Sequence, residues 1–283
     1  MIKIETLDKI DNHTHFLTPT IFPDGTSQTW KLPEEILKSN NVKITWNFEN
    51  EAELIHLCSL RKLIKPQFIH LHIPYLPYAR QDKPISNTST FNLETFGDIL
   101  NVFNFHLITS IDVHNPKYTA KLIPNFHNME VLNIIDNLRV MVKPDILLFP
   151  DSGAEDRYRN FRSPKIIGQK IRNQLTGELS DDYRFNYDDP NINDIGGYYN
   201  ITEKIKDCLK PGTKILIIDD ICDGGRTFIN LVTALKKFES NLEFSLFVTH
   251  GIFSKGRTVL FESGIKTVYT TNSLLKNEDG FKV

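Results

Sequence analysis

Apolar and polar residues follow two periods along this chain, one typical of buried strands and one typical of amphipathic helices. Short apolar runs predict strands at residues 68–74, 106–113, 145–149, 214–218, 244–248 and 267–271. Between several of these runs, apolar residues recur every three or four positions, which predicts helices at residues 92–103, at 131–142 and from residue 227 onward. Strands that alternate with helices predict an α/β fold with parallel sheets covered by helices on both faces.

The predicted elements fall into two groups separated near residues 125–128. A length of 283 residues fits about two domains, and a hydrophobic content of 40% is sufficient for two cores. We therefore expect an N-terminal domain at residues 1–127 and a C-terminal domain at residues 128–283. The polar stretch 180–197 has little apolar periodicity and predicts a mobile loop or an insertion.

Composition narrows the classes of function. The formal net charge of −2 gives no basic field for neutralising nucleic-acid phosphates. No apolar run approaches the roughly 20 residues that span a bilayer, and the first residues lack the apolar core of a signal peptide. The three cysteines are widely spaced and indicate neither a disulfide framework nor a zinc site. We expect a cytoplasmic protein with no nucleic-acid or membrane partner.

One segment, residues 215–227, carries most of the chemical information. Four apolar residues, 215–218, predict a buried strand, and Asp219 and Asp220 follow where that strand is expected to end. A glycine-containing turn and a helix come next. Ligands of open α/β sheets bind at the carboxyl ends of strands, where backbone amides and a helix N-terminus face an anion. Adjacent acids there can hold sugar hydroxyls or metal-bound water, while the turn holds a phosphate.

This segment resembles the ribose-phosphate-binding motif shared by type I phosphoribosyltransferases and ribose-phosphate diphosphokinases (PRPP synthetases). Other segments resemble the second family and occur in that family's order, closest to its shorter, phage-type members. They are FPDG at 22–25, IPYLPYARQD at 73–82, IDVHNP at 111–116, FPDSGAEDR at 149–157, KIR at 170–172 and THG at 249–251. The resemblance implies two tandem type I phosphoribosyltransferase-like domains, each a mainly parallel sheet flanked by helices.

The activity implied by this resemblance is Mg²⁺-dependent transfer of the β,γ-diphosphate of ATP to the anomeric hydroxyl of ribose 5-phosphate, giving PRPP and AMP. Matching positions imply catalytic roles for Lys170 and Arg172 and metal binding by His114 and Asp151. The implied ATP-binding residues are Phe22, Asp24, Arg80, Gln81 and Asp82, of which the first two reach a neighbouring subunit's site in a homo-oligomer, a dimer or a hexamer. The implied ribose-phosphate-binding residues are Asp219, Asp220, Asp223, Gly224, Gly225, Arg226 and Thr227.

Some of these residues have simpler interpretations. Lys170 and Arg172 lie two positions apart, so on an extended segment both point the same way and can clamp the migrating diphosphate; an ordinary basic surface is the alternative. A lone histidine after a strand, such as His114, is more often structural than a ligand, although its IDVHNP context favours metal. Arg157 is either a supporting cation at the site or half of a surface ion pair.

The chain departs from the family pattern at two turns. Thr26 stands after FPDG where the family usually has an acid. The family's phosphate turn reads Asp-Thr-small-Gly-Thr, whereas residues 223–227 read Asp-Gly-Gly-Arg-Thr. Gly224 thus removes a hydroxyl, and Arg226 adds a cation able to grip two phosphate oxygens. This combination suits a 5′-phosphate that continues into a diphosphate, as in ADP-ribose; the alternative is that Arg226 neutralises an ordinary monoester and ribose 5-phosphate is the acceptor.

Two other classes of protein share parts of this pattern. A type I phosphoribosyltransferase consumes PRPP with a similar turn, but it does not need segments 73–82 and 111–116. A catalytically silent regulatory subunit of the synthetase type should have lost the cations at 170 and 172 or the metal residues. Since the chain keeps both sets, an active synthetase is favoured.

Overall fold

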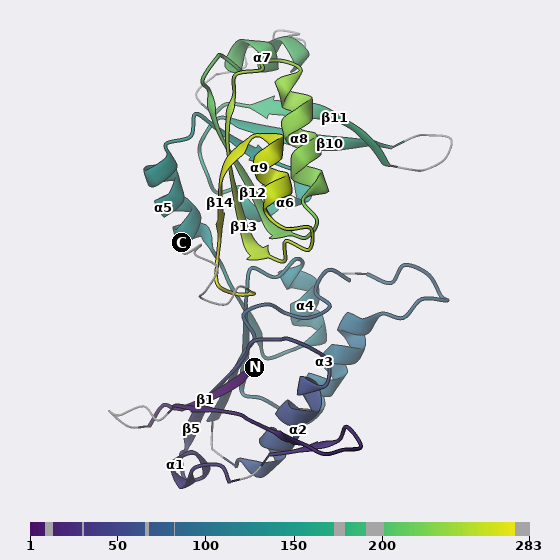
Figure 1. Cartoon of the computed structure of the whole chain (residues 1–283), viewed down its shortest axis with the longest axis vertical. Coiled ribbons are helices and arrows are strands. Elements are labelled where there is room, and N and C mark those ends of the chain that lie inside the picture. Colours follow the sequence, from purple (N-terminus) through teal and green to yellow (C-terminus); the bar gives the residue numbers. More distant parts are fainter. Residues whose placement is uncertain are drawn as a thin grey trace. The chain divides into compact units, whose positions relative to one another are not determined.

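The computed structural model describes residues 1–8, 14–29, 31–65, 68–81, 83–172, 179–190 and 201–274. The chain divides into two compact units, Met1–Glu130 (unit 1) and Val131–Val283 (unit 2). Each unit contains a six-stranded, mainly parallel sheet with helices packed on it (Figure 1). The α/β fold class with two mainly parallel sheets is therefore confirmed.

The division between the units lies slightly beyond the expected position. The sequence placed it between residues 127 and 128, which is inside strand β8 (Phe126–Met129). That strand pairs in parallel with β7 from Ile108↔Phe126 to Ile111↔Met129, so the whole of β8 belongs to unit 1. The two units are accordingly divided between Glu130 and Val131.

Unit 1 is built on a sheet with the strand order β2-β1-β5-β6-β7-β8, in which β5 to β8 are parallel. The strands are β1 (Ile2–Thr6), β2 (Thr14–Phe16), β5 (Asn41–Trp46), β6 (Phe68–His72), β7 (Leu107–Ile111) and β8. A separate hairpin pairs β3 (Thr20–Ile21) with β4 (Ser27–Gln28). The helices are α1 (Glu34–Leu37), α2 (Glu53–Leu63), α3 (Asn92–Phe103) and α4 (Pro116–Leu122).

The core of unit 1 lies on one face of this sheet. Alternate residues of β6, Ile69 and Leu71, are buried in a cluster with residues of α2 and α3, whereas His70 and His72 face the other way and are half-buried. Helix α3 has the predicted bounds, 92–103, and buries Leu93, Phe96 and Leu100 in that cluster. Helices α2 and α3 therefore cover the face of the sheet that carries Ile69 and Leu71.

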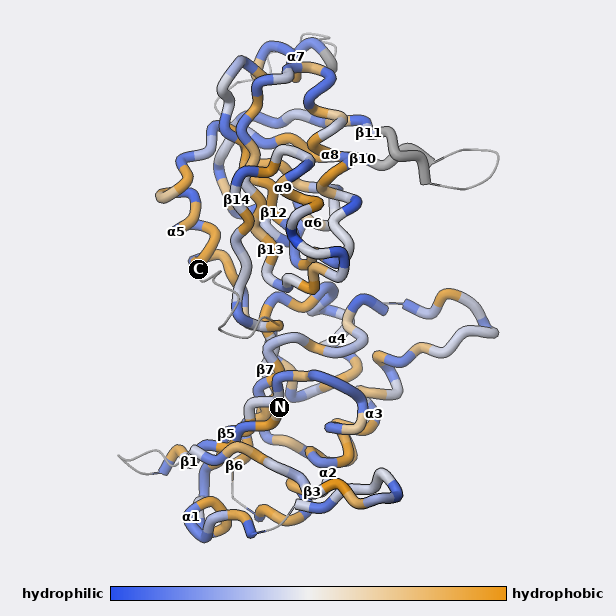
Figure 2. The backbone as a smooth tube through the Cα atoms, in the orientation of Figure 1, coloured by the Kyte–Doolittle hydropathy of each residue, from blue (hydrophilic) through white to orange (hydrophobic). Residues whose placement is uncertain are grey.

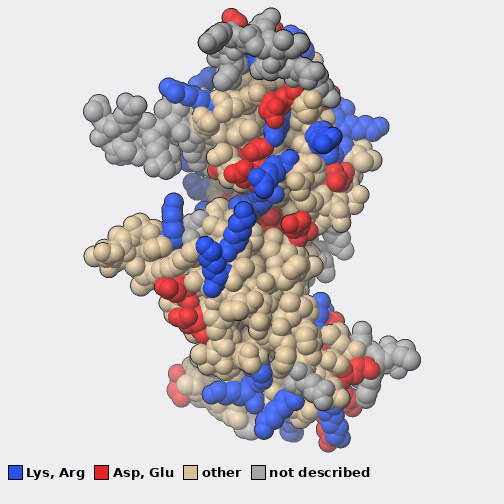
Figure 3. Space-filling model, turned by 180° about the vertical axis from the view of Figure 1, so that it is seen from behind, with Lys and Arg blue, Asp and Glu red and all other residues tan. Residues whose placement is uncertain are grey.

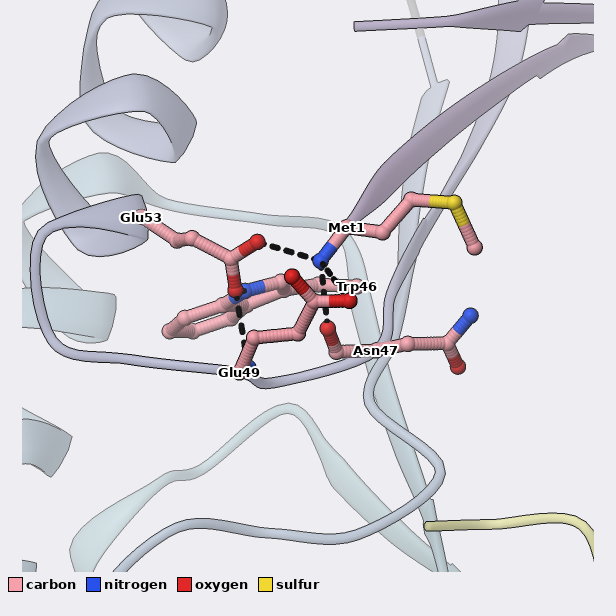
Figure 4. Close-up of polar contacts among 5 residues, drawn as sticks. All are labelled: Met1, Trp46, Asn47, Glu49 and Glu53. Atoms are coloured by element: carbon pink, nitrogen blue, oxygen red, sulfur yellow. Dashed lines mark hydrogen bonds and ion pairs between the residues drawn. The ribbon is translucent and has the colours of Figure 1, made fainter. Parts of the chain in front are cut away.

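A buried carboxylate fastens α2 to the sheet of unit 1 (Figure 4). Glu53 accepts hydrogen bonds from the indole Nε1 of Trp46 and from the backbone N of Glu49, both at 2.9 Å. The amino group of Met1 forms an ion pair with the same carboxylate and donates to the carbonyl oxygen of Asn47 at 2.7 Å. Burial opposes the charge, but these donors hold the pKa of Glu53 below its ordinary value. The charged carboxylate thus ties β1, β5 and α2 together.

Unit 2 is built on a sheet with the order β11-β10-β9-β12-β13-β14, in which only β11 is antiparallel to its neighbour. The strands are β9 (Ile146–Phe149), β10 (Lys165–Arg172), β11 (Leu179–Asp188), β12 (Lys214–Cys222), β13 (Glu243–Gly251) and β14 (Ile265–Thr270). The helices are α5 (Leu132–Val142), α6 (Ser152–Tyr158), α7 (Ile201–Cys208), α8 (Arg226–Lys236) and α9 (Thr258–Ser263).

Helices cover both faces of the unit 2 sheet. Helices α8 and α9 lie on one side and α5 lies on the other (Figure 1). Helix α6 lies on the side of α5, because its Tyr158 stacks on Phe149 of β9, outside the core cluster that contains α8 and α9. The central strand β12 is buried on both faces at residues 215–218, as predicted, and its apolar run is visible in Figure 2. Helix α8 buries Phe228, Leu231 and Leu235 on the predicted face. The buried sheet therefore forms an apolar core that supports the residues at the ends of its strands.

The expectation of a loop at residues 180–197 is wrong for its first half. Residues 179–188 form strand β11, which pairs antiparallel with β10. The reason is an alternation of aromatic residues, in which Tyr183, Phe185 and Tyr187 pack on the core of unit 2 and Phe185 meets the ring of Phe238 edge-on. Residues 191–200 lie outside the described part of the chain.

Two features are relevant to the kinds of partner that the protein can have: the distribution of its surface charges and the length and apolar character of its helices. Acidic and basic side chains are interspersed on the face shown in Figure 3, with uncharged surface between them. This distribution agrees with the net charge of −2. No helix among the described residues has the length and apolar character needed to cross a membrane.

Candidate functional site

Strand β12 brings two adjacent carboxyl groups to the edge of the unit 2 sheet where its parallel strands end. The strand was expected to stop at residue 218, but it continues to Cys222, so Asp219 and Asp220 (the acidic pair) lie within it. The extension arises because β13 is equally long: Asp219 pairs with Val248, and Cys222 pairs with Gly251. The acidic pair therefore stands at the carboxyl edge, where α/β sheets bind ligands.

The negative charges of the acidic pair are only partly balanced by a nearby cation. Asp220 is buried, and its Oδ1 lies 2.9 Å from Nη1 of Arg157 on α6, with the two side chains only 4% and 14% exposed. Asp219 accepts a hydrogen bond from the backbone N of Asp220 at 2.9 Å. Burial and the adjacent Asp220 carboxyl raise the pKa of Asp219 well above its ordinary value, and Arg157 offsets this only in part. Arg157 is thus a supporting cation, one of the two roles that its sequence allowed.

The segment after β12, residues 223–227 (the glycine turn), includes the first two residues of α8, Arg226 and Thr227. Gly225 precedes the helix with φ 78°, and a Cβ there would lie 2.8 Å from Cδ2 of Leu260. Only glycine fits this position without strain. Since α8 begins at Arg226, the backbone N–H groups of the helix N-terminus lie at the turn. Such groups are suited to binding an anion.

The side chain of Cys222, just before the glycine turn, has a packing role. Its side chain is buried. Burial above all, together with the carboxyls of Asp219 and Asp223, raises the pKa of its thiol to about 12. The thiol therefore stays protonated and is unsuited to nucleophilic chemistry.

A loop after β13, residues 252–257 (the covering loop), is fastened to the glycine turn. The backbone N atoms of Ile252 and Phe253 donate to the carbonyl oxygen of Cys222 at 2.9 and 3.1 Å. The Ser254 hydroxyl donates to Oδ1 of Asp223 at 2.6 Å. Lys255 lies beside Gly224, and its side-chain carbons come within 3.5 to 3.7 Å of where a Cβ of Gly224 would stand.

Lys255 is the residue that the sequence analysis missed. Its sequence signal was slight, because it is one of two cations, Lys255 and Arg257, that follow the THG segment by a few positions. Nothing in the spacing indicated that this loop folds back onto the glycine turn, where Ser254 contacts Asp223, 31 positions earlier. That proximity comes from the parallel pairing of β12 with β13, which ends with Cys222↔Gly251.

Asp151, an expected metal residue, follows β9 at the same carboxyl edge, since β9 and β12 are parallel neighbours. It is exposed and caps α6, with Oδ1 accepting from the backbone N of Ala154 at 2.9 Å. Its other carboxylate oxygen is not needed for this cap. One edge of unit 2 therefore gathers Asp151, the acidic pair and the glycine turn.

The expected catalytic cations lie on β10. The backbone at Lys170 and Arg172 is extended, as the sequence analysis assumed, but the pairing with β11 shifts between them, from Lys170↔Tyr183 to Arg172↔Leu179. This irregularity interrupts the simple alternation from which we expected both side chains to point the same way. The two side chains lie outside the described atoms, so their roles remain predictions.

In unit 1, His114 follows β7 on a tightly held segment. Asp112 is buried and has φ 45°, an unusual conformation for a residue other than glycine. The next backbone N, of Val113, donates to Oδ1 of Asn128 at 2.8 Å. Asn115 caps α4 by accepting from the backbone N of Tyr118 at 3.0 Å. His114 lies between the hydrogen-bonded residues Val113 and Asn115 and is half-buried. A strained backbone, such as that of Asp112, often marks a functional site.

The expected ATP-binding segment follows β6, which is the parallel neighbour of β7, so it leaves the sheet at the same edge as His114. Arg80 is exposed. Gln81 has a structural role, because its Oε1 accepts from the backbone N of Asn92, the first residue of α3, at 2.9 Å. Its side-chain amide N–H groups are not used in this contact. Asp82 lies outside the described residues.

Phe22 and Asp24 lie on the turn of the β3–β4 hairpin, and both are exposed. Oδ1 of Asp24 accepts from the backbone N and from the hydroxyl of Thr26, at 3.0 and 2.7 Å. The departure from the family pattern at Thr26 thus stabilises this turn. The hairpin is held to α2 by a hydrogen bond of 2.6 Å between Ser27 and His56.

The expected site residues accordingly form two groups, one in each unit. In unit 1, Arg80, Gln81 and His114 lie on segments that leave the same edge of the sheet. In unit 2, Asp151, the acidic pair and the glycine turn do so. No cluster of three or more histidine, cysteine or acidic side chains with the geometry of a metal site occurs among the described residues.

Comparisons with known proteins identify similar chains along nearly the whole length. No protein-family model matches. The "Ribose-phosphate pyrophosphokinase" of Mycoplasmopsis pulmonis is 26% identical over 283 residues, covering 95% of this chain and 80% of that protein. Proteins of the same name from Saccharolobus solfataricus and Pyrococcus abyssi are 24% and 22% identical, covering 91% and 94% of this chain and 84% and 88% of their own lengths.

A solved structure has the same fold. It is the phosphoribosylpyrophosphate synthetase from Mycobacterium smegmatis, with a TM-score of 0.68 and 19% sequence identity. The match covers 93% of this chain and 82% of that one. At this identity the likeness shows the fold alone.

Proposed function

The chain belongs to the ribose-phosphate pyrophosphokinase family, and on this premise we propose that it transfers the β,γ-diphosphate of ATP to the anomeric hydroxyl of ribose 5-phosphate, giving PRPP and AMP. One observation supports this most, the acidic pair of β12 followed at once by the glycine turn at the start of α8. Sugar hydroxyls need acceptors, and a phosphate needs N–H donors. This segment offers both, in adjacent positions at the binding edge of the sheet.

Each group at this edge has a proposed role toward the acceptor. Asp219 and Asp220 accept hydrogen bonds from the ribose hydroxyls, while Arg157 holds Asp220 in position through its 2.9 Å contact. The 5′-phosphate lies against the backbone amides of the glycine turn, where Thr227 adds a hydroxyl and Arg226 a cation. The acceptor is thus fixed at both ends, which leaves its anomeric hydroxyl directed away from the turn.

The donor set of unit 2 fits Mg²⁺. This ion prefers oxygen ligands, takes few from the protein and keeps several waters. Asp219 suits it, because the raised pKa of this carboxyl indicates a negative charge that nearby residues balance only in part. Asp151 keeps one oxygen beyond its cap of α6. When bound, Mg²⁺ would neutralise phosphate charge. We propose that His114, in unit 1, also contributes to binding Mg²⁺.

ATP is proposed to bind residues of unit 1, with Arg80 and the amide of Gln81 contacting its polar groups together with Asp82. The acceptor oxygen attacks the β-phosphorus, the bond from that phosphorus to the oxygen bridging to the α-phosphorus breaks, and AMP leaves with that oxygen. Lys170 and Arg172 are proposed to stabilise the charge that develops on the migrating diphosphate. The proton of the attacking hydroxyl is released.

We propose that the active form is a homo-oligomer, at least a dimer, in which the β3–β4 hairpin completes a neighbour's ATP site. The support is that Phe22 and Asp24 stand exposed on a hairpin turn stabilised by Thr26. An inactive Asp24→Ala variant mixed with an inactive Lys170→Ala variant should then recover part of the activity, because some sites in mixed oligomers contain neither substitution. A fully active monomer in sedimentation experiments would rule this out.

The experiment that tests the proposal measures AMP release from ATP with Mg²⁺ and ribose 5-phosphate. Lys170→Ala and Arg172→Ala should each lower kcat by roughly a hundredfold and leave ATP affinity nearly unchanged, since these cations act mainly in the transition state. Arg162→Ala, which removes an exposed arginine just before β10, is the matched control and should change kcat by less than about twofold. Parental turnover in both test variants would remove the two cations from the mechanism.

A second acceptor is favoured by specific residues of the glycine turn. Gly224 lacks the hydroxyl that the family pattern has, and Arg226 is exposed at the first position of α8. Both features suit a 5′-phosphate that continues into a second phosphate, as in ADP-ribose, with the diphosphate then added to its terminal ribose. The ratio of kcat/KM for ADP-ribose and ribose 5-phosphate, in the parent and in Arg226→Gly, distinguishes the two acceptors.

A further inference from the structure

We infer that Lys255 is a specificity-determining residue of the acceptor site, and that it favours acceptors whose 5′-phosphate carries a second phosphate. The inference rests on the proposed function, since it assumes that the glycine turn binds the phosphate end of a ribose phosphate. It adds a residue from a different loop, with no place in the sequence motif of the turn.

The first observation is the position of the Lys255 side chain. The three atoms nearest to a Cβ placed on Gly224 would be Cγ, Cδ and Cε of Lys255, at 3.7, 3.5 and 3.6 Å. The methylene chain of Lys255 therefore borders the space that the absent side chain of Gly224 leaves. A cation on such a chain reaches the same region of the turn as the phosphate that the turn is proposed to hold.

The second observation is that the backbone carrying Lys255 is held in place. The covering loop is fastened to Cys222 by two backbone hydrogen bonds and to Asp223 by the Ser254 hydroxyl. A further backbone bond, from N of Gly256 to O of Phe253 at 2.8 Å, closes the loop around Lys255. Since these bonds join the loop to the two residues immediately before Gly224, the backbone of the lysine is positioned before any ligand arrives.

The third observation concerns charge. Other lysines of unit 2 use their ammonium groups within the fold: Lys165 pairs with Glu155, and Lys236 donates to the carbonyl oxygen of Ser263 at 2.8 Å. Within the described part of the chain, no hydrogen bond or ion pair engages the ammonium of Lys255, whose side chain is exposed. Its charge is therefore available to a ligand.

Two cations beside one turn exceed what a phosphate monoester needs when backbone amides and a hydroxyl already surround it. Arg226, at the start of α8, carries a planar guanidinium, and Lys255, on the covering loop, carries a point charge. A diphosphate carries additional charged oxygens beyond the first phosphorus, and a flexible lysine is suited to reach them. The chemical class that fits is a ribose whose 5′-oxygen bears a diphosphate, free or esterified to a nucleoside.

The test compares Lys255→Met, which keeps the methylene chain and removes the charge, with the parent enzyme. Steady-state AMP release is measured with ADP-ribose and with ribose 5-phosphate as acceptors. The value of kcat/KM for ADP-ribose should fall roughly tenfold, mainly through KM, whereas the loss for ribose 5-phosphate should be roughly twofold. Lys210→Met, which changes an exposed lysine at the opposite end of β12, should alter neither value.

Equal losses for both acceptors, or no loss for either, would overturn the inference. A parent enzyme that neither uses nor binds ADP-ribose would also overturn it. If the parent releases no AMP with either acceptor, the proposed function fails, and calorimetry with ADP-ribose then decides the role of Lys255 alone. Weaker binding to Lys255→Met than to the parent would uphold that role, and equal binding would contradict it.

Discussion

Asp219 is a half-buried carboxyl group beside a second carboxyl, Asp220, and both its burial and this neighbour make it hold its proton more tightly. The folded-state pKa of Asp219 is raised well above its ordinary value of 3.8 by burial and by Asp220. The folded protein therefore binds more protons than the unfolded chain between these two values. Consequently the free energy of unfolding should fall as the pH rises from about 3.8 through the folded-state pKa.

Asp219→Asn should remove this penalty. We expect a higher Tm than the parent at neutral pH, a flatter dependence of Tm on pH, and loss of AMP release. Thermal unfolding across the acid and neutral range measures the first two, and Asp156→Asn, an exposed acid on α6, serves as the control. A lower Tm at neutral pH would show that the Asp219 charge stabilises the fold instead.

The two glycines of the turn should respond differently to the same substitution. Gly225 has φ 78° and its added Cβ would lie 2.8 Å from Leu260, so Gly225→Ala should cost about 3 kcal/mol of unfolding free energy. At Gly224 a Cβ would make ordinary contacts with Lys255 at 3.5 Å or more, so Gly224→Ala should change it by less than about 0.5 kcal/mol. Chemical denaturation compares the two, and equal effects would contradict the described turn.

At this scale the sequence analysis proposed residues that lie on one contiguous motif, and it did not connect that motif with a residue that folding brings beside it. The acidic pair and the glycine turn lie within a few positions of one another, so a local pattern was enough to propose them together. Lys255 meets Gly224 only because β12 and β13 end side by side. Gln81 shows another limit, since its role in holding Asn92 depends on a helix eleven positions away.

Two elements, α6 and β12, are joined by the buried contact between Arg157 and Asp220. Removing the cation leaves Asp220 buried beside Asp219 with less compensation, so Arg157→Met should lower the free energy of unfolding by about 3 kcal/mol. The matched control is Arg159→Met on the same segment, whose side chain is 66% exposed and lies 4.0 Å from Asp156. That variant should change stability by less than about 0.5 kcal/mol.

Equal stability of the two arginine variants in denaturant titrations would mean that the buried contact contributes no more than an exposed one. A loss confined to Arg157→Met would instead show that the acidic pair depends on its supporting cation.

Strands β6 and β7 are linked by one hydroxyl that two histidines share. Oγ1 of Thr109 lies 2.7 Å from Nε2 of His70 and 2.8 Å from Nδ1 of His72. Burial first, and then the charge of Lys43, lower the pKa of His72 from 6.5 to about 4. The unfolded chain binds the proton more readily, so stability should be lost as the pH falls from about 6.5 to about 4.

His72→Asn should retain a polar atom for Thr109 and lack a group that titrates in this range. Its stability loss on acidification should be smaller than that of the parent, whereas His127→Asn, which changes an exposed histidine on β8, should behave like the parent. Unfolding curves at both ends of the pH window measure the difference. An unchanged acid dependence in His72→Asn would assign that dependence to other groups.

Element prediction succeeded where a single period dominated and failed where aromatic and charged residues were mixed. Helix α3 matches its predicted bounds because Leu93, Phe96 and Leu100 repeat at helical spacing. Strand β11 was missed because its alternating Tyr183, Phe185 and Tyr187 are separated by polar residues within an acidic stretch. The extra length of β12 was also missed, since two aspartates inside a strand look like its end until the pairing with β13 is known.

At the scale of the whole molecule, each unit has its own buried core and its own set of expected ligand residues. The sequence showed this division from the grouping of strands, although β8 moved the boundary by three residues, from 127 to 130. Unit 1 carries the residues proposed for ATP, and unit 2 carries those proposed for the sugar phosphate. A reaction that joins these two substrates therefore requires the whole chain, which fits the similarity to pyrophosphokinases over 95% of its length.

The identity of the products tests this account most directly. ATP, Mg²⁺ and a 5′-phosphorylated ribose acceptor are incubated with the full chain, and phosphorus NMR and mass spectrometry identify every phosphate-containing product. We predict AMP and an acceptor bearing a new diphosphate at its anomeric oxygen, in equal amounts, with no product from the Asp219→Asn variant. Formation of ADP, or the absence of any diphosphorylated acceptor in the presence of intact, folded protein, would contradict the proposed function.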